Sequence, residues 1–202
     1  MVSDPVLRGR RAAFLDRDGV INVDHGYVFR RADFEFVEGV LEACATLAAR
    51  GFALVVVTNQ SGIGRGIYSE ADFADLTTWM TTRFAAANAS LAGVYFCPHH
   101  PVDGKGVYRI ECCCRKPAPG MLLKAARELQ IDLARSVLFG DKRLDLEAAA
   151  AAGVPVRVLL GSNGTHMPAA IEGSLCSARF RSLAEAVASA PLWNLLGEAS
   201  HA

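Results

Sequence analysis

A short apolar run, Ala12–Leu15, ends abruptly in two aspartates, Asp16 and Asp18, which are followed by Gly19. Such a run is typical of a buried strand, and a glycine allows the chain to turn sharply directly after it. Two carboxylates separated by one residue repel each other, so a cation normally stabilises them, and Mg²⁺ suits such oxygen ligands best. The alternative is a strand followed by an ordinary acidic turn. The run therefore predicts a buried strand that ends at a candidate cation site.

The length and composition of the chain indicate one domain that spans residues 1–202. With 202 residues, of which 51% are hydrophobic, the chain can bury a full-sized core. The formal net charge of +0 argues against nucleic acid or an acidic membrane as a partner bound by general electrostatics. No apolar stretch is long enough to span a bilayer, and the first apolar run is broken at Asp16. This pattern argues against a signal peptide and predicts a cytoplasmic protein.

Strand-like runs alternate with helical patterns along the chain. The strand candidates are Ala12–Leu15, Ala53–Val57, Val94–Phe96, Val137–Phe139 and Val156–Leu160. The helix candidates are Gly39–Arg50, Ser69–Ala87, Pro119–Leu129, Asp145–Ala152 and a last helix capped by Ser182. Alternation of this kind, with apolar strands, predicts an α/β fold in which helices cover both faces of a doubly wound parallel sheet.

Polar side chains follow the strand candidates at the sheet edge where ligands bind in such folds. Thr58, Asn59, Gln60 and Ser61 follow the second candidate, and Gly140-Asp141-Lys142 follows the fourth. Carboxylates that hold a cation, a hydroxyl and amides that bond phosphate oxygens, and a lysine that neutralises charge together suit a metal and phosphate site. In the alternative interpretation Asp141 caps a helix, Thr58 only ends a strand and Lys142 is a solvated charge. Residues 62–66 lack the glycine spacing of a dinucleotide motif and suggest a flexible substrate loop.

Cysteines and histidines cluster in a segment of about residues 97–114. Cys97-Pro98-His99 and Cys112-Cys113-Cys114 offer enough sulfur and nitrogen ligands for a tetrahedral zinc. The one-residue spacing within each pair is unusual for structural zinc, and Cys113 and His100 compete as ligands. The alternative is a set of buried, reduced cysteines.

Taken together, these motifs resemble those of a known family. Asp16-Arg17-Asp18-Gly19, Thr58, Lys116 and Gly140-Asp141-Lys142 are similar, in order, to the four motifs of the haloacid dehalogenase superfamily of phosphohydrolases. The resemblance is closer to the D-glycero-D-manno-heptose 1,7-bisphosphate phosphatases within it. The segments that carry this closer resemblance are Phe14–Tyr27, Gly51–Gly64, Cys97–Pro101, Cys114–Leu123 and Gly140–Lys142.

The resemblance implies a Rossmann-like fold without a separate cap domain, and a catalytic role for each matched motif. Asp16 would be the nucleophile that becomes an aspartyl-phosphate, and Asp18 the general acid and then base. Thr58 and Lys116 would stabilise the transferring phosphoryl group. The expected Mg²⁺ ligands are Asp16, the backbone carbonyl of Asp18, and Asp141. The expected ligands of a structural zinc are Cys97, His99, Cys112 and Cys114.

The resemblance also implies the substrate. Asp24, His25, Gly26, Tyr27 and Arg115 would contact the sugar and its second phosphate. The expected reaction removes the C7 phosphate from the heptose bisphosphate in the synthesis of nucleotide-activated heptose. Histidinol-phosphate phosphatase is the nearest alternative, a DNA 3′-phosphatase is more distant, and a zinc-loop module that binds nucleic acid is a different class. The expected partner is a small sugar bisphosphate, and the expected state is a monomer.

Overall fold

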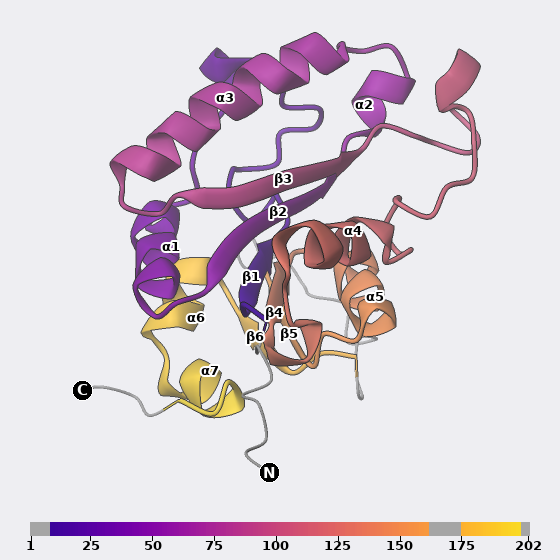
Figure 1. Ribbon diagram of the computed structural model, residues 1–202. Helices are drawn as coiled ribbons and strands as arrows, with labels where there is room; N and C mark the ends of the chain where they lie inside the picture. Colours follow the sequence, from indigo (N-terminus) through magenta and orange to yellow (C-terminus); the bar gives the residue numbers. More distant parts are fainter. Residues whose placement is uncertain (1–8, 162–174, 199–202) are drawn as a thin grey trace.

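The computed structural model describes residues 9–161 and 175–198, and this part of the chain forms a parallel sheet between two helical layers (Figure 1). In it, six parallel strands lie in the order β3-β2-β1-β4-β5-β6. The strands are β1 (Ala12–Leu15), β2 (Ala53–Asn59), β3 (Leu91–Cys97), β4 (Val137–Gly140), β5 (Val156–Leu160) and β6 (Ala178–Phe180). This order is that of a doubly wound sheet, so the predicted fold class is confirmed.

Helices pack on both faces of the sheet. One face carries α1 (Val40–Ala49), α3 (Glu70–Ala86), α6 (Leu183–Ala188) and α7 (Ala190–Leu195), and the other carries α4 (Gly120–Leu129) and α5 (Arg143–Ala152). Side chains alternate along β1, so Ala13 and Leu15 join the first of these cores while Ala12 and Phe14 join the second. Both sides of β1 are therefore buried, which explains why its sequence is an unbroken apolar run.

The structure differs from the sequence prediction mainly in short elements. Residues 62–66 were expected to be a flexible loop, but Ser61–Gly64 forms the short helix α2, and a side chain at Gly62 or Gly64 would collide with Tyr68 or with the Pro98 carbonyl. The strand β6 and the helix α7 were not expected, because three residues around an arginine and six residues with an early proline carry little periodicity. Short 3₁₀ turns lie at Arg31–Asp33, Gly106–Tyr108 and Leu133–Arg135.

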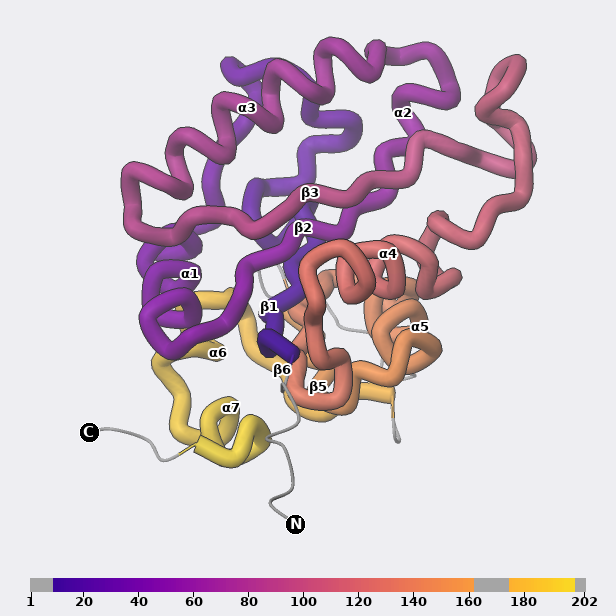
Figure 2. The backbone as a smooth tube through the Cα atoms, viewed as in Figure 1, coloured from indigo at the N-terminus to yellow at the C-terminus, as the bar shows by residue number. Residues whose placement is uncertain are grey.

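The connection from β3 to α4 matters for the site. Figure 2 shows the chain leaving β3 and running outward as a long loop before it returns to α4. At the opposite, amino-terminal end of the sheet, Glu198 pairs with Arg11 and Arg50, and the Arg50 guanidinium lies 3.8 Å from the centre of the Trp193 ring. In the described residues, no helix is both long enough and apolar enough to cross a bilayer.

Candidate active site

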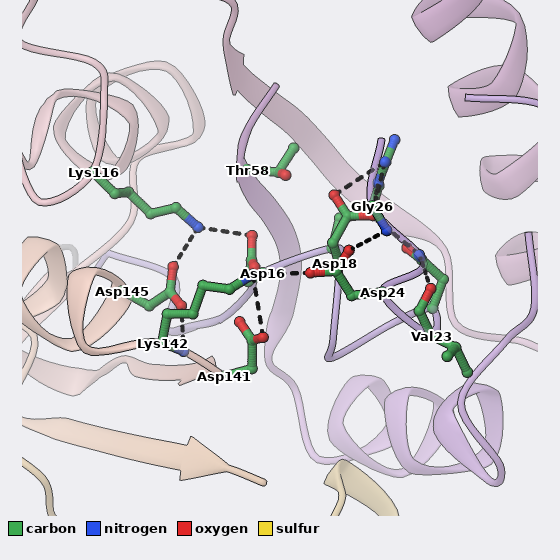
Figure 3. A network of polar contacts seen from close by, with 12 residues as sticks. Asp16, Asp18, Val23, Asp24, Gly26, Thr58, Lys116, Asp141, Lys142 and Asp145 are labelled. Atoms are coloured by element: carbon green, nitrogen blue, oxygen red, sulfur yellow. Dashed lines mark hydrogen bonds and ion pairs between the residues drawn. The ribbon is translucent and has the colours of Figure 1, made fainter. Parts of the chain in front are cut away.

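The carboxyl ends of β1, β2 and β4 meet at one edge of the sheet and form a cavity of about 240 Å³. Many of the predicted site residues line it. They are Asp16, Asp18, Asp24, Gly26, Tyr27, Thr58, Asn59, Gln60, Ser61, Lys116 and Lys142. Asp145 also lines the cavity, and Asp141 lies beneath Asp16 (Figure 3). We call Asp16, Lys116, Asp141 and Asp145 the pocket floor.

Lys116 is the central cation of the pocket floor. It precedes α4 and is only 3% exposed, and its Nζ donates to Asp16 Oδ1 at 2.7 Å and to the Val57 carbonyl at 2.9 Å. The same Nζ lies 2.5 Å from Asp145 Oδ1. Burial lowers the pKa of Lys116, but the negative charges of Asp145 and Asp16 outweigh it and hold this pKa above its usual value. The lysine is therefore a permanent positive charge beneath the reacting group.

The carboxylates of the pocket floor are crowded together. One oxygen from each of Asp16, Asp141 and Asp145 lies within 4.8 Å of the others. Asp141 Oδ1 is buried and has no hydrogen-bond partner in the part of the chain that the structure describes. Burial raises the pKa of Asp16, and burial together with the charge of Asp16 raises the pKa of Asp141 to about 7. A hard divalent cation held by Asp16 and Asp141 would offset the repulsion between these buried carboxylates, so the donor set fits magnesium.

Asp145 is the residue of the pocket floor that sequence reasoning missed. The sequence pattern predicts only that it begins a helix, whereas α5 begins two residues earlier and turns Asp145 inward, where it is 2% exposed. Its Oδ2 accepts from the Lys142 amide at 3.0 Å, while its Oδ1 faces Lys116. The signal that could have found it is its place in the first helical turn after Asp141, where a side chain points back toward the strand end.

Asp18 is held by donors from three directions. Arg17, which is 1% exposed, donates through Nη2 to Asp18 Oδ1 at 2.8 Å, and Asn22 Nδ2 donates to the same oxygen at 3.0 Å. Gln60 Nε2 donates to Asp18 Oδ2 at 3.0 Å. Gly19 makes the turn possible, because its φ of +91° favours glycine and a Cβ there would lie 2.3 Å from Asp141 Oδ2. The orientation of the Asp18 carboxylate is thus fixed by its neighbours.

The outer part of the cavity is more exposed. Lys142 Nζ lies 3.1 Å from Asp24 Oδ2 and 3.4 Å from Asp141 Oδ2 (Figure 3). Burial opposes the charge of Lys142, but Asp141 and Asp24 hold its pKa above the usual range. Gly26 and Tyr27 line the same cavity, and Tyr27 is 45% exposed. We call Asp24, Gly26, Tyr27 and Lys142 the pocket rim.

The structure places three predicted binding residues differently from the rest. His25 lies in a separate hollow, with its Nε2 3.5 Å from Glu35 Oε2, and Arg115 Nη1 donates to the His99 carbonyl at 3.2 Å. Neither residue lines the cavity described above. Asn59 uses its side chain within the protein, because its Oδ1 and Nδ2 bond the backbone N–H and carbonyl of Lys116 at 3.1 and 3.2 Å.

A second cluster of metal-ligating side chains lies in the loop between β3 and α4. The Sγ atoms of Cys97, Cys112 and Cys114 are 3.1 to 3.5 Å apart, and His99 Nδ1 lies 3.4 Å from Cys114 Sγ. Cys113 is exposed and is not part of this group, and His100 Nδ1 accepts from the amides of Val102 and Asp103 instead. One nitrogen and three sulfurs at these distances suit a tetrahedral zinc.

Comparisons with known proteins agree with this geometry. The model of the haloacid dehalogenase-like hydrolases matches residues 8–153. The D-glycero-beta-D-manno-heptose-1,7-bisphosphate 7-phosphatase of Vibrio cholerae is 56% identical over 149 residues, which cover 74% of this chain and 80% of that protein. The protein of the same name from Escherichia coli K12 is 52% identical over 159 residues, 79% of this chain and 83% of that one.

A solved structure is also similar. It is the D,D-heptose 1,7-bisphosphate phosphatase from B. bronchiseptica complexed with magnesium and phosphate, which superposes with a TM-score of 0.76 at 32% identity. The match covers 88% of this chain and 96% of that one. The likeness therefore extends over most of the chain.

Proposed function

Because this chain belongs to the haloacid dehalogenase-like hydrolases and, among them, to the heptose bisphosphate phosphatases, we propose that it removes the phosphate at C7 of D-glycero-beta-D-manno-heptose 1,7-bisphosphate. The beta anomer follows the names of the relatives. The observation that carries the proposal is the pocket floor, where Lys116 lies 2.7 Å from Asp16 and the unpartnered Asp141 oxygen lies beneath. A buried carboxylate placed between a fixed cation and a candidate metal site suits attack on a phosphate.

In the first step Asp16 attacks phosphorus. A bond forms between its carboxylate oxygen and phosphorus, the bond between phosphorus and the C7 oxygen breaks, and Asp18 gives its proton to that oxygen. Asp16, Asp141 and the backbone carbonyl of Asp18 would hold magnesium, which supplies the positive charge that lets a phosphate approach a carboxylate. Lys116 and the Thr58 hydroxyl stabilise the charge on the equatorial oxygens.

In the second step water releases the phosphate. Asp18, now a carboxylate, takes a proton from water as the water oxygen attacks phosphorus, and the Asp16–phosphorus bond breaks. The products are inorganic phosphate and heptose 1-phosphate. Asp145 keeps both of its oxygens on Lys116 and the Lys142 amide, so its role is to orient these two residues.

We propose further that Cys97, His99, Cys112 and Cys114 hold a structural zinc. Four protein ligands leave no free position, so such an ion cannot activate water. It would instead make the loop rigid and fix the position of Lys116, which follows Cys114 by two residues. The pocket rim would contact the sugar, and Arg115 and His25 would reach the far phosphate only if the bound substrate extends beyond the cavity.

A phosphate-release assay tests the proposed function. Purified protein with Mg²⁺ is given the beta and alpha anomers of the heptose bisphosphate, histidinol phosphate and an oligonucleotide with a 3′-phosphate. We expect the highest kcat/KM for the beta bisphosphate, and retention of the C1 phosphate in the product. Faster hydrolysis of histidinol phosphate would show that the protein is a histidinol-phosphate phosphatase instead. Faster hydrolysis of the oligonucleotide would show that it is a DNA phosphatase.

A further inference from the structure

One hydrogen-bonded side chain connects the two candidate catalytic residues that lie above the pocket floor. Gln60 precedes α2 and is 2% exposed, and its Nε2 donates to Asp18 Oδ2 at 3.0 Å and to Thr58 Oγ1 at 2.9 Å. Its Oε1 accepts from the Tyr68 hydroxyl at 2.5 Å. Every polar atom of this amide thus has a partner within the protein, which makes a direct bond from Gln60 to substrate unnecessary for its burial.

The direction of each hydrogen bond follows from the chemistry of the partners. When Asp18 is a carboxylate, as it is in the second step of the proposed reaction, its oxygens can only accept hydrogen bonds. The amide nitrogen of Gln60 therefore faces Asp18, and its carbonyl oxygen faces Tyr68. The Tyr68 hydroxyl has one proton, and the Gln60 oxygen takes it. The two protons of Nε2 then go to Asp18 and Thr58.

The hydrogen bond from Gln60 also determines the orientation of the Thr58 hydroxyl. Because Thr58 Oγ1 accepts from Gln60, its own proton points elsewhere, and among the described residues Thr58 Oγ1 donates no hydrogen bond. Thr58 lines the cavity beside Asp16. Its proton is therefore directed toward the space that a phosphoryl oxygen would occupy.

Tyr68 is rigid enough to set this arrangement. Its ring stacks on Phe29 with centres 5.0 Å apart and planes 10° apart, and it is 7% exposed. Gly62 allows the close approach, because a Cβ there would lie 2.1 Å from Tyr68 Cε1. Burial raises the pKa of Tyr68 to about 12, so its hydroxyl stays a donor over the range of an ordinary assay.

We propose that Tyr68 and Gln60 are positioning residues for phosphoryl transfer, in which Tyr68 fixes the Gln60 amide and Gln60 fixes both the Asp18 carboxylate and the Thr58 hydroxyl. The inference rests on the proposed function. It gives Gln60 a role different from the direct substrate contact that its sequence position suggests. It also gives a role to Tyr68, which no sequence motif singled out.

A double-mutant cycle tests this arrangement, which we call the Tyr68–Gln60 relay. Tyr68→Phe, Gln60→Met and the double variant are compared with the parent in kcat and KM for the beta heptose bisphosphate, and in Tm. We expect kcat to fall about tenfold in Tyr68→Phe and about 100-fold in Gln60→Met, with KM changed by less than about twofold. Because Tyr68 acts only through Gln60, the double variant should be no slower than Gln60→Met.

Several results would overturn the relay. They are a parental kcat in Tyr68→Phe, additive losses in the double variant, or a rise in KM alone, which would make Tyr68 a substrate contact. Tyr95→Phe is the matched control, since it removes a surface hydroxyl 3.0 Å from Glu128 Oε2 and should keep the parental kcat. If Gln60→Met did not fold, Gln60→Glu would replace it, because it keeps the shape and the acceptor for Tyr68 but loses the donors. An inactive parent would refute the proposed function itself, whereas an active parent with an unaffected Tyr68→Phe would refute only the relay.

Discussion

The pocket floor and the loop of residues 97–114 both gather charged or metal-ligating side chains, but different forces hold them. The pocket floor lies at the ends of buried strands and at the start of α5, and Lys116 and Asp145 are each 3% or less exposed. The loop buries little apolar surface, and Val107 within it is 80% exposed. The hydrophobic core therefore positions the pocket floor, whereas we expect the loop to be held by zinc bound to the Cys97–His99–Cys112–Cys114 cluster.

The two regions meet at Lys116. This lysine follows the loop by two residues, yet its Nζ reaches Asp16 and Asp145, and Asn59 holds its backbone on the other side. A change in the loop should therefore affect activity through the placement of Lys116. A change in the pocket floor should affect the chemistry or the charge balance directly. The predictions below separate these two kinds of effect.

Asp16→Asn should have the largest effect, because an amide cannot accept the phosphoryl group. We expect kcat to fall by at least about 10⁴-fold, with little change in Tm. Phosphate release measures the loss, and trapping of phosphorylated protein should succeed only with the parent. Asp75→Asn, on the exposed side of α3, is the matched control and should keep full activity. Parental activity in Asp16→Asn would remove Asp16 from the mechanism.

Asp141→Asn tests whether charge crowding strains the metal-free pocket floor. The pKa of Asp141 rises from its usual 3.8 to about 7 on folding, so the folded protein binds a proton more tightly than the unfolded chain does. Asp141 should then contribute most to the stability of the metal-free protein below pH 4. This contribution should be lost progressively as pH rises to about 7. The full pKa shift of Asp141 corresponds to at most about 4 kcal/mol of unfolding free energy.

The measurement is the difference in unfolding free energy between Asp141→Asn and the parent, in the presence of a chelator. The variant should be more stable by about 2–4 kcal/mol at pH 8, and the gap should close toward pH 4. Magnesium should narrow the gap at pH 8, because it stabilises only the parent strongly. A gap that is independent of both pH and magnesium would show that the carboxylates do not repel one another as described.

The sheet and the residues at its carboxyl edge are the part of the molecule that the sequence predicts best. The apolar run of β1 and the polar residues after β1, β2 and β4 determine the sheet and most of the pocket, because parallel strands bring their carboxyl ends to one edge. Asp16, Thr58 and Asp141 could be located for that reason alone. In the cysteine-rich loop the structure brings Cys97, His99, Cys112 and Cys114 together and leaves Cys113 exposed, and their role as zinc ligands stays a prediction.

Sequence reasoning is weaker where packing decides. Asp145 depends on α5 beginning at Arg143, and Tyr68 depends on the exact path of α2 around Gly62, neither of which a periodic pattern reveals. The linear motif predicts that Arg115 and His25 contact the substrate, but the turn of each loop directs them to the His99 carbonyl and to Glu35. Side-chain direction in loops is a tertiary property, and it is the part of the site that spacing does not determine.

Cys114→Ser tests the loop side of the comparison. We expect loss of bound zinc and a decrease in kcat of about 10- to 100-fold, because Lys116 loses the anchor on its amino-terminal side. Cys113→Ser is the matched control, and should keep both zinc and activity because its side chain lies outside the cluster. Metal analysis and kcat are measured together. Zinc loss in Cys113→Ser but not in Cys114→Ser would reverse the assignment of ligands.

Asp24→Asn, in the pocket rim, should have the smallest effect. Asp24 is about one-third exposed and Lys142 about half exposed, so their ion pair is screened by solvent and contributes less than about 1 kcal/mol to stability. Lys142 also keeps Asp141 as a second partner at 3.4 Å, so its charge remains in place when Asp24 is neutralised. We therefore expect an unchanged Tm and kcat, and a rise in KM of about two- to fivefold from the lost sugar contact. A loss of kcat as large as that of Cys114→Ser would mean that the rim, like the floor, takes part in the transition state.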